Sequence, residues 1–414
     1  MSKVVIITLG CKQNKYESDC MANILKSNGY EVFEELVPAD VYIINTCAVT
    51  SEAEKKSRQY ISKCKKLNDS AKIVICGCAS EKNAGQFESK ENVFSIIGNE
   101  GKEKILEYIT KSIKQKNELS KDYVSPSNPQ KTTTREHIKI QDGCNNFCSY
   151  CIIPYLRGRS RSRDLNSIVD EAKLIASRSK EIVLTGIDIS SYKVGDKPAL
   201  ALLMSSLKDI DAQIRLGSLE VGVITRELME VLKSMPNFAP HFHLSLQSGD
   251  EHILKKMNRH YTPDEFFEKT KLIREYFPDA NLTTDVIVGF AGETQEQFEN
   301  TKAFIEKVGF SYVHVFPYSK REGTRAYSFE DLPMQTKKQR VAILEELNKT
   351  LKSNYLSKFL GRKGTVLIEG KKTYFEGFSP EYIRCYLDDV VECSHIYDIE
   401  FVELFEDGIK VKLV

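Results

Sequence analysis

The first part of the sequence alternates between apolar, β-branched runs and polar stretches with helical periodicity. The strand-like runs are Val4–Leu9, Val41–Asn45 and Lys72–Ile75. Helix-like stretches at about Glu17–Asn28 and Ser51–Lys66 separate them. This β–α–β–α–β order predicts a parallel sheet with right-handed crossovers. We therefore expect a Rossmann-like N-terminal domain over residues 1–115.

A second alternating pattern begins after a polar stretch at residues 116–136. That stretch contains Ser125-Pro126 and Asn128-Pro129 and is predicted to be a linker. Over residues 137–357 the strand-like runs are Glu181–Leu184, Ile214–Leu219, His241–Leu246, Asn281–Val288 and Val313–Phe316. Strands alternating with helices predict an α/β barrel, full or partial. Residues 358–414 contain short apolar runs broken by glycines, which predict a small all-β module.

Composition and charge narrow the class of protein. The chain has 414 residues and a net charge of +1, so any nucleic-acid surface must be a local one. We find neither a cleavable signal pattern nor an apolar run of about 20 residues, so we expect a cytoplasmic protein without a membrane span. In that compartment the eleven cysteines are better candidates for metal ligands or catalysis than for disulfides.

Three cysteines are concentrated in one central segment. Cys144, Cys148 and Cys151 have the spacing CxxxCxxC and follow a strand-like run at Ile138–Gln141. Four thiolates would close a zinc or [4Fe–4S] site, whereas three leave one iron open to bind and activate a substrate. The alternative is a zinc knuckle with a fourth ligand elsewhere in the chain.

Three further cysteines each follow a predicted parallel strand. Cys11, Cys47 and Cys78 lie just beyond the strand ends, which meet at one edge of such a sheet. The order of elements therefore predicts a second three-thiolate site with an open iron. Cys76 competes with Cys78, because residues two apart on a strand share a face. The alternative is that these cysteines are unrelated and merely buried.

For other residues near these motifs the sequence supports less specific predictions. Candidates for hydrogen bonds to sulfur in the N-terminal site are Asn14, Asn45 and Thr46. Cysteines expected to be packing residues are Cys20, Cys64, Cys385 and Cys393. Arginines that alternate after the central cysteines are Arg157, Arg159, Arg161 and Arg163. An extended backbone would put these four guanidinium groups on one face, suited to RNA phosphates; the alternative is a solvated strand face.

Together these motifs resemble the radical S-adenosylmethionine (radical-SAM) methylthiotransferases over nearly the whole chain. The matching segments are TLGCKQN at 8–14, INTCAVT at 44–50, CGCAS at 76–80, IQDGCNNFCSYCIIPYLRGRSRSR at 140–163, LTGIDISSY at 184–192, LSLQSGDEHILKKMNRHYT at 244–262, TTDVIVGFAGET at 283–294 and FPYSKREGT at 316–324. Within the family, GCKQNKYES and IIPYLRGRSRSR look closest to the branch acting on N6-threonylcarbamoyladenosine next to the anticodon of tRNA.

The resemblance implies a fold and a chemistry. The central domain would be a partial TIM-type barrel, and the tail at 358–414 a TRAM-like RNA-binding barrel. Cys144, Cys148 and Cys151 would hold a catalytic [4Fe–4S] cluster that generates the 5′-deoxyadenosyl radical. Cys11, Cys47 and Cys78 would hold an auxiliary [4Fe–4S] cluster carrying the sulfur. Two S-adenosylmethionine (SAM) molecules per turnover would supply the radical, which abstracts hydrogen from C2 of the adenine, and the methyl group.

The resemblance also implies contacts and partners. Candidate SAM-binding residues are Tyr150, Gly186, Gln247, Ser248, Gly289 and Glu293. For Gly289 and Glu293 the alternative is an ordinary strand-to-helix turn, and for Gln247 and Ser248 it is the beginning of a polar loop. The partners would be the tRNA substrate and an electron-donor protein. Rival readings are the same chemistry on N6-isopentenyladenosine or on a ribosomal-protein aspartate, and a non-catalytic iron–sulfur RNA-binding protein.

Overall fold

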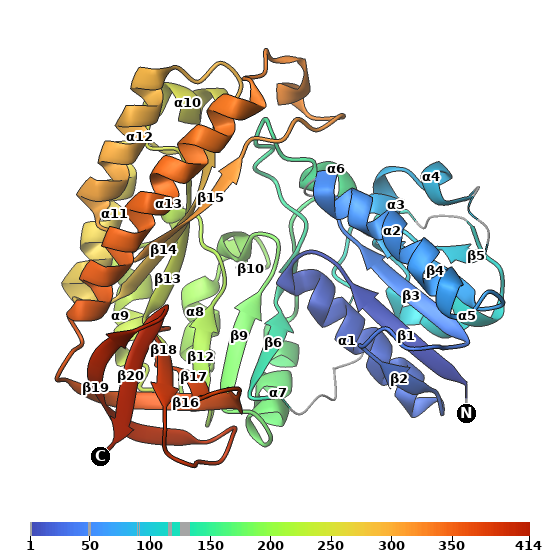
Figure 1. Cartoon of the computed structure of the whole chain (residues 1–414), viewed down its shortest axis with the longest axis horizontal. Coiled ribbons are helices and arrows are strands. Elements are labelled where there is room, and N and C mark those ends of the chain that lie inside the picture. Colours follow the sequence, from blue (N-terminus) through green and yellow to red (C-terminus); the bar gives the residue numbers. More distant parts are fainter. Residues whose placement is uncertain (1, 49–50, 89, 91, 115–117, 125–132) are drawn as a thin grey trace. The chain divides into compact units, whose positions relative to one another are not determined.

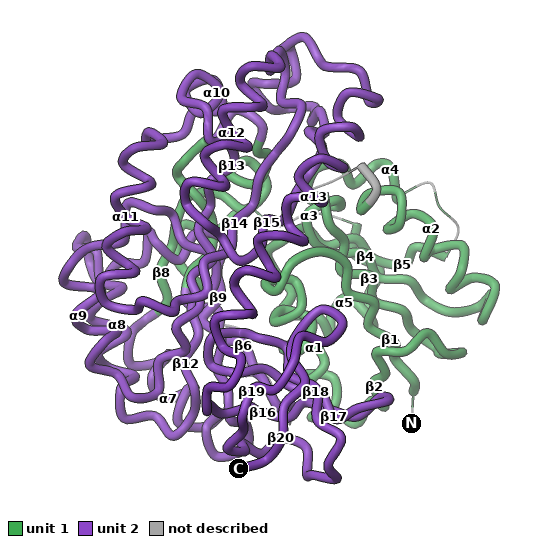
Figure 2. Tube along the Cα trace, turned by 60° about the vertical axis from the view of Figure 1, so that its left-hand side comes forward, with its two compact units in different colours: residues 1–131, 141–147, 151–163 green, residues 132–140, 148–150, 164–414 purple. Residues whose placement is uncertain are grey.

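The computed structural model describes residues 2–48, 51–88, 90, 92–114, 118–124 and 133–414. The chain forms two compact units (Figure 2). Unit 1 comprises residues 1–131, 141–147 and 151–163, and unit 2 comprises residues 132–140, 148–150 and 164–414. Of the predicted linker at 116–136, residues 116–117 and 125–132 lie outside the described residues. The four predicted domain boundaries stay predictions.

Unit 1 contains a five-stranded parallel sheet with the order β2-β1-β3-β4-β5 (Figure 1). Its strands are β1 Lys3–Thr8, β2 Glu31–Phe33, β3 Val41–Thr46, β4 Lys72–Gly77 and β5 Val93–Ile96. The predicted N-terminal parallel sheet is therefore confirmed. The edge strands β2 and β5 were not predicted, because three or four residues are too few to show a periodic pattern.

Helices cover both faces of this sheet. They are α1 Lys12–Ser27, α2 Ser51–Leu67, α3 Cys78–Lys82, α4 Gly85–Glu88, α5 Ile105–Thr110 and α6 Ile153–Arg157, with the 3-10 turn η1 Lys102–Lys104 and the short strands β7 Gln141–Asp142 and β8 Arg161–Ser162. Apolar residues of α1 and α5 pack on one face, and those of α2, α4 and α6 pack on the other. Helix α1 begins five residues before the predicted start, because the buried polar residues Gln13 and Asn14 hide its helical period.

Unit 2 begins with a partial barrel of parallel strands. Two three-stranded sheets have the orders β12-β9-β6 and β13-β14-β15. Their strands are β6 Arg135–Lys139, β9 Glu181–Thr185, β12 Gln213–Leu216, β13 His241–Gln247, β14 Asn281–Val288 and β15 Tyr312–Pro317. Isolated bridges from Ile214 to Phe238 and from Leu219 to Leu244 join the two sheets. The fold is therefore the partial form of the predicted α/β barrel.

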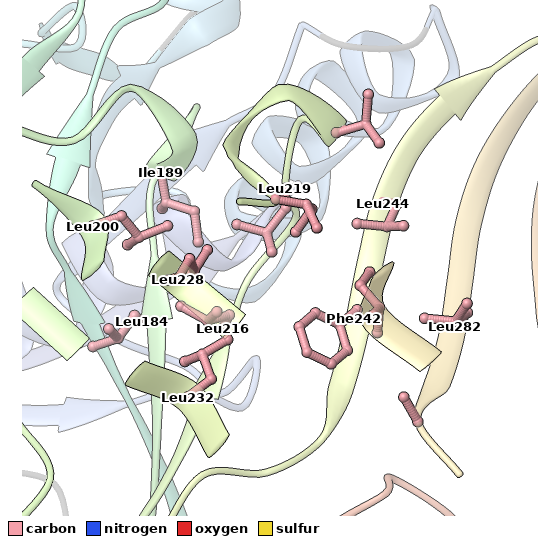
Figure 3. Packing of buried hydrophobic residues seen from close by; sticks show 14 of the residues in the cluster. Leu184, Ile189, Leu200, Leu216, Leu219, Leu228, Leu232, Phe242, Leu244 and Leu282 are labelled. Carbon is pink, nitrogen blue, oxygen red and sulfur yellow. The ribbon is translucent and has the colours of Figure 1, made fainter. Parts of the chain in front are cut away.

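Helices pack on the outer face of this barrel, and the hydrophobic core lies between the helices and the strands. They are α7 Leu165–Ala176, α8 Leu200–Ser206, α9 Arg226–Ser234, α10 Glu251–Lys256, α11 Pro263–Tyr276, α12 Gln295–Val308 and α13 Met334–Ser357, with the 3-10 turns η2 Ile189–Ser191, η3 Val221–Val223 and η4 Arg325–Ser328 and the hairpin β10 Lys193–Val194 and β11 Lys197–Pro198. In Figure 3, Leu216 and Phe242 of the strands lie close to Leu232 of α9. The buried leucines fix the strands whose ends carry the candidate site.

The C-terminal tail forms a closed five-stranded barrel with the order β16-β17-β18-β20-β19. Its strands are β16 Lys363–Lys371, β17 Phe375–Phe378, β18 Arg384–Leu387, β19 Ile396–Phe405 and β20 Gly408–Leu413. The predicted all-β module is confirmed. Tyr355 and Leu356, at the end of α13, belong to its apolar core. Among the described helices, none has the length and apolar character that crossing a membrane requires.

Candidate iron–sulfur centres

The register of the unit 1 sheet brings three cysteine-bearing loops to one edge. Thr8 of β1 pairs with Asn45 of β3, and Asn45 pairs with Cys76 of β4. Since the strands are parallel, their carboxyl ends lie side by side. Cys11, Cys47 and Cys78 follow these ends within three residues, which is the arrangement that the sequence predicts.

Two glycines show how closely these loops approach each other. A Cβ atom added to Gly10, whose φ is +102°, would lie 2.8 Å from both Cβ and Sγ of Cys47. A Cβ atom on Gly77, whose φ is +95°, would lie 2.5 Å from the backbone oxygen of Thr46. Both positions require glycine for conformation and for space. The residues before Cys11 and Cys78 therefore touch the loop that carries Cys47.

Position at the sheet edge distinguishes Cys78 from its competitor, since both cysteines are buried. Cys76 belongs to an apolar cluster beneath α1 and α5, and burial raises the pKa of its thiol to about 12. Cys78 begins α3, and its Sγ lies 3.7 Å from Oδ1 of Asn99. Because Cys78 follows the end of β4, beside the loops of Cys11 and Cys47, whereas Cys76 lies within the strand, the structure favours Cys78.

The remaining cysteines divide into two groups. Cys20, Cys64 and Cys385 are buried, as expected of packing residues. Burial raises the pKa of Cys64 to about 12 and also raises that of Cys385. Cys393 is exposed, so the prediction that it is a packing residue is wrong. It lies in a turn between β18 and β19, where there is no core to cover it.

The polar side chains at this edge of the sheet donate hydrogen bonds to backbone oxygens rather than to sulfur. The side-chain amide of Asn14 donates to the backbone oxygens of Leu9, at 2.7 Å, and Thr46, at 3.0 Å. The amide of Asn45 donates to the backbone oxygen of Asn14 at 2.9 Å, and the Thr46 hydroxyl donates to that of Cys76 at 2.6 Å. The prediction that these donors reach sulfur is therefore corrected: they fix the loops that carry the cysteines.

The central triplet lies in a loop that is tied down near its start. Cys144 donates its backbone N–H to the oxygen of Gly158 at 3.1 Å. A Cβ atom on Gly143, whose φ is +70°, would lie 2.0 Å from the backbone oxygen of Arg159. All three thiols of the triplet, those of Cys144, Cys148 and Cys151, are partly accessible. Accessible thiols on a fixed loop fit a cluster that must meet a substrate.

Arg259 is a site residue that the sequence analysis missed. Its Nη1 donates to the Sγ of Cys148 at 3.3 Å, and its Nη2 donates to the backbone oxygen of Ser245 at 3.0 Å. Burial opposes its charge, but the neighbouring groups, Tyr261 first, outweigh this and raise the pKa of the guanidinium. Arg259 lies in the quoted 244–262 segment, yet only the fold brings it to Cys148.

The donors at both places are cysteine thiols, which are the usual ligands of iron–sulfur clusters. Within the described ranges, no three His, Cys, Asp or Glu side chains come close enough to hold one metal ion. In a cubane each thiolate binds a different iron, so the sulfurs stand further apart than around one ion. Gly10 lets its loop approach the Cys47 thiol, so the Cys11 and Cys47 loops lie against each other at this edge.

Two of the predicted SAM contacts lie at strand ends of unit 2, and another lies in the central cysteine loop. Tyr150 is half-buried, and its ring lies edge-on to Phe290 with centroids 6.4 Å apart. Gly186 directly follows β9. Gln247 ends β13 at a bulge with a positive φ of 66°. Gly186 and Gln247 thus lie at carboxyl strand ends, and contact of all three residues with SAM stays a prediction.

Three other predicted contacts already have partners within the fold. The Ser248 hydroxyl is fully buried, lies 3.1 Å from Oγ1 of Thr301 and accepts from the backbone N–H of Asp250. Oε2 of Glu293 accepts from the backbone N–H of Gly289 at 2.7 Å and from Arg340 of α13. Burial raises the pKa of Glu293. These contacts match the alternative interpretation, in which the residues build strand-to-helix turns.

The four alternating arginines do not form one face. Helix α6 ends at Arg157, and Gly158 then turns the chain with a φ of +76°. The prediction of a continuous extended segment is therefore wrong. Arg157, Arg161 and Arg163 are 1%, 8% and 3% exposed, whereas Arg159 is exposed and stacks on Phe147.

The buried arginines also have internal partners. Arg157 pairs with Glu17 and Asp142, and Arg161 pairs with Glu100. Nη1 of Arg163 lies 3.3 Å from the Tyr16 hydroxyl. A guanidinium that is buried and neutralised by carboxylates does not present its donors to phosphate. RNA contact is therefore withdrawn for these three residues, and only Arg159 stays a candidate.

Known proteins define the class to which this fold and these motifs correspond. Residues 138–305 match the Radical SAM superfamily, and residues 3–98 match the uncharacterized protein family UPF0004. Among solved structures, the radical S-adenosylmethionine methyltransferase TsrM from Kitasatospora setae has a TM-score of 0.59 at 14% identity, covering 79% of this chain and 77% of that one. This likeness concerns the fold.

Relatives narrow the class to a family. The threonylcarbamoyladenosine tRNA methylthiotransferases MtaB of Aquifex aeolicus and Rickettsia prowazekii are 37% and 34% identical, covering 88% and 99% of this chain and 92% and 97% of those proteins. A tRNA-2-methylthio-N(6)-dimethylallyladenosine synthase of Malacoplasma penetrans is 33% identical, covering 91% of this chain and 82% of that protein. The chain belongs to the radical SAM tRNA methylthiotransferase family. It is an enzyme that transfers a methylthio group, and its family implies SAM, a [4Fe–4S] cluster and a tRNA substrate.

Proposed function

We propose that this enzyme methylthiolates C2 of N6-threonylcarbamoyladenosine next to the anticodon of tRNA, using two [4Fe–4S] clusters. The observation that carries the substrate is the similarity to MtaB enzymes, which extends over as much as 99% of this chain. The proposal of a second cluster rests on the register of β1, β3 and β4, which aligns the loops of three further cysteines.

Each cysteine set has its own role in this proposal. Cys144, Cys148 and Cys151 hold the catalytic cluster, to which SAM binds. Cys11, Cys47 and Cys78 hold the auxiliary cluster. When bound, these groups supply one-electron cleavage of SAM, hydrogen abstraction from the adenine, and the sulfur to be inserted; the methyl group comes from a second SAM. The protein's part is to position the groups and to exclude side reactions.

The chain's own residues position these thiols. Arg259 donates to the sulfur of Cys148 and fixes its orientation. Gly10 and Gly77 let the loops of the first set approach each other. A hydrogen bond to sulfur also stabilises negative charge on the thiolate, which tunes the reduction potential of the cluster. Electrons would come from a separate donor protein in the cytoplasm.

The tRNA would contact an exposed basic part of the C-terminal barrel. The solvent-exposed basic residues there are Lys358, Arg362, Lys363, Lys371 and Lys372. Arg362 pairs with Asp279, and Lys372 lies 3.7 Å from Glu376. Lys363 and Lys371, together with Arg159 of unit 1, are therefore the residues we assign to phosphate contacts.

The experiment is mass spectrometry of tRNA nucleosides from cells lacking this enzyme. The methylthio form of threonylcarbamoyladenosine should disappear and return when the wild-type chain is supplied. The chain with Cys144→Ala should not restore it. Loss of methylthio-isopentenyladenosine instead, with the threonylcarbamoyl form intact, would contradict the proposed substrate and favour the dimethylallyladenosine branch of the family.

A further inference from the structure

A buried charge network of unit 1 lies among the elements that carry the auxiliary cysteines. Arg157, at the end of α6, is 1% exposed. Its Nη1 donates to Glu17 at 2.7 Å and to Asp142 at 3.3 Å, and its Nη2 donates to Oδ1 of Asn14 at 2.7 Å. Lys102 pairs with the other oxygen of Glu17. Arg161 pairs with Asp142 and Glu100, so three bases and three acids form one network that is largely excluded from solvent.

This network joins segments that are remote in the sequence. Glu17 and Asn14 belong to α1, which begins directly after Cys11. Asp142 lies in β7, two residues before Cys144. A single guanidinium therefore connects the helix that follows one predicted cluster ligand to the strand that leads into another. Its planar fork allows several carboxylate and amide oxygens to be held at fixed angles.

Arg157 also lies close to Cys78. Leu156, its neighbour in α6, packs in the same apolar cluster as Cys78 and accepts a hydrogen bond from Asn99 at 2.8 Å. Asn99 in turn lies 3.7 Å from the sulfur of Cys78. Arg157 Nε is buried and has no hydrogen-bond acceptor among the described residues. A buried donor without an acceptor is destabilising, so a group that accepts from it is expected.

We propose that Arg157 is the positioning residue of the auxiliary iron–sulfur site: it locks the helix after Cys11 to the strand before Cys144 and places a fixed positive charge and an unused N–H beside Cys78. This rests on the proposed two-cluster function and goes beyond it. Three thiolates give a [4Fe–4S] cluster a net negative charge, and loss of the Arg157 cation would leave the charges of Glu17 and Asp142 uncompensated near it. The reduction potential depends on such charges and on hydrogen bonds to sulfur.

The test isolates the auxiliary cluster in the full-length chain. The parent protein carries Cys144→Ala, Cys148→Ala and Cys151→Ala and should hold about four irons. Arg157→Gln in this background should lower iron per chain at least twofold, and the cluster that remains should have a more negative midpoint in an EPR-monitored titration. Arg157→Lys, which keeps the charge but loses the fork, should fall between the two.

Arg178→Gln provides the matched control. Arg178 also forms a two-pronged pair with a buried carboxylate, that of Glu136, but it lies in unit 2. Iron content and midpoint in Arg157→Gln equal to those of the parent overturn the inference, as does an equal loss in Arg178→Gln. If Arg157→Gln does not fold, Arg157→Lys decides by the same criteria. A parent protein without iron contradicts the two-cluster function itself.

Discussion

The two cysteine sets differ in how far apart their members lie in the sequence. Cys144, Cys148 and Cys151 share one loop, so their spacing alone brings them together. Cys11, Cys47 and Cys78 come from the ends of three strands, so their proximity depends on the register of a whole sheet. A local set tolerates changes elsewhere in the fold, whereas a set built on register can be lost through a residue that binds nothing.

The largest expected effect separates the roles of the two sets. Wild-type protein should contain about eight irons, and alanine replacement of either set should leave about four. Replacing the central set should abolish both SAM cleavage and product. Replacing Cys11, Cys47 and Cys78 should abolish product but retain cleavage of SAM to 5′-deoxyadenosine. Iron analysis and chromatography of the products measure both results.

A single substitution provides the control for this experiment. Cys76→Ala should retain about eight irons, because the Cys76 thiol is buried with a pKa of about 12. Cys78→Ala should lose iron and product. If Cys76→Ala lost the cluster and Cys78→Ala kept it, the order of these two cysteines in the site would be the reverse of our assignment.

A smaller effect is expected from Gly10→Ala, which tests register without removing a ligand. The φ of +102° would cost roughly 1–3 kcal/mol for alanine, and the new Cβ would displace Cys47, which lies 2.8 Å away. Iron in the auxiliary site should fall severalfold, while SAM cleavage persists. Gly29→Ala is the control, because its φ is also positive but no atom lies within 4 Å of its added Cβ. Equal effects of both variants would contradict the specific role of Gly10.

Glu181→Gln should have the smallest effect on the chemistry, although its effect on stability should be large. Glu181, at the amino end of β9, is fully buried between Arg215 and Arg135, at 2.8 Å and 2.6 Å. Burial raises its pKa, but the two arginines outweigh this and lower it. Glu181→Gln should destabilise the chain by roughly 3–5 kcal/mol at neutral pH, because it leaves buried arginine charge uncompensated, while each cluster keeps its iron.

The pH dependence of Glu181→Gln follows from the sign of this shift. A lowered pKa means that the carboxylate stabilises the folded chain above the unfolded pKa, about 4.3. That contribution is lost as the pH falls toward the lower folded value. The stability difference between wild type and Glu181→Gln should therefore shrink on acidification, as chemical unfolding at several pH values will show. A constant difference would mean that the Glu181 charge is not the cause.

The sequence by itself determined the features that depend on neighbouring residues, namely the strands, the helices and the central cysteine loop. Its apolar periods located β1, β3, β4 and the later barrel strands, and the CxxxCxxC spacing located the central set. Alternation of strands and helices was enough to align Cys11, Cys47 and Cys78, because parallel strands share a carboxyl edge. These inferences need only local patterns and one rule of topology.

Only the tertiary structure decided which side chains are buried and with whom they pair. It placed Cys76 within β4, in the apolar cluster beneath α1 and α5, and Cys78 after the strand end, at the start of α3. It turned the chain at Gly158, so that Arg157 meets Glu17 instead of solvent. It also brought Arg259 to Cys148. The burial and pairing of a charge depend on residues far away in sequence, and no local pattern carries that information.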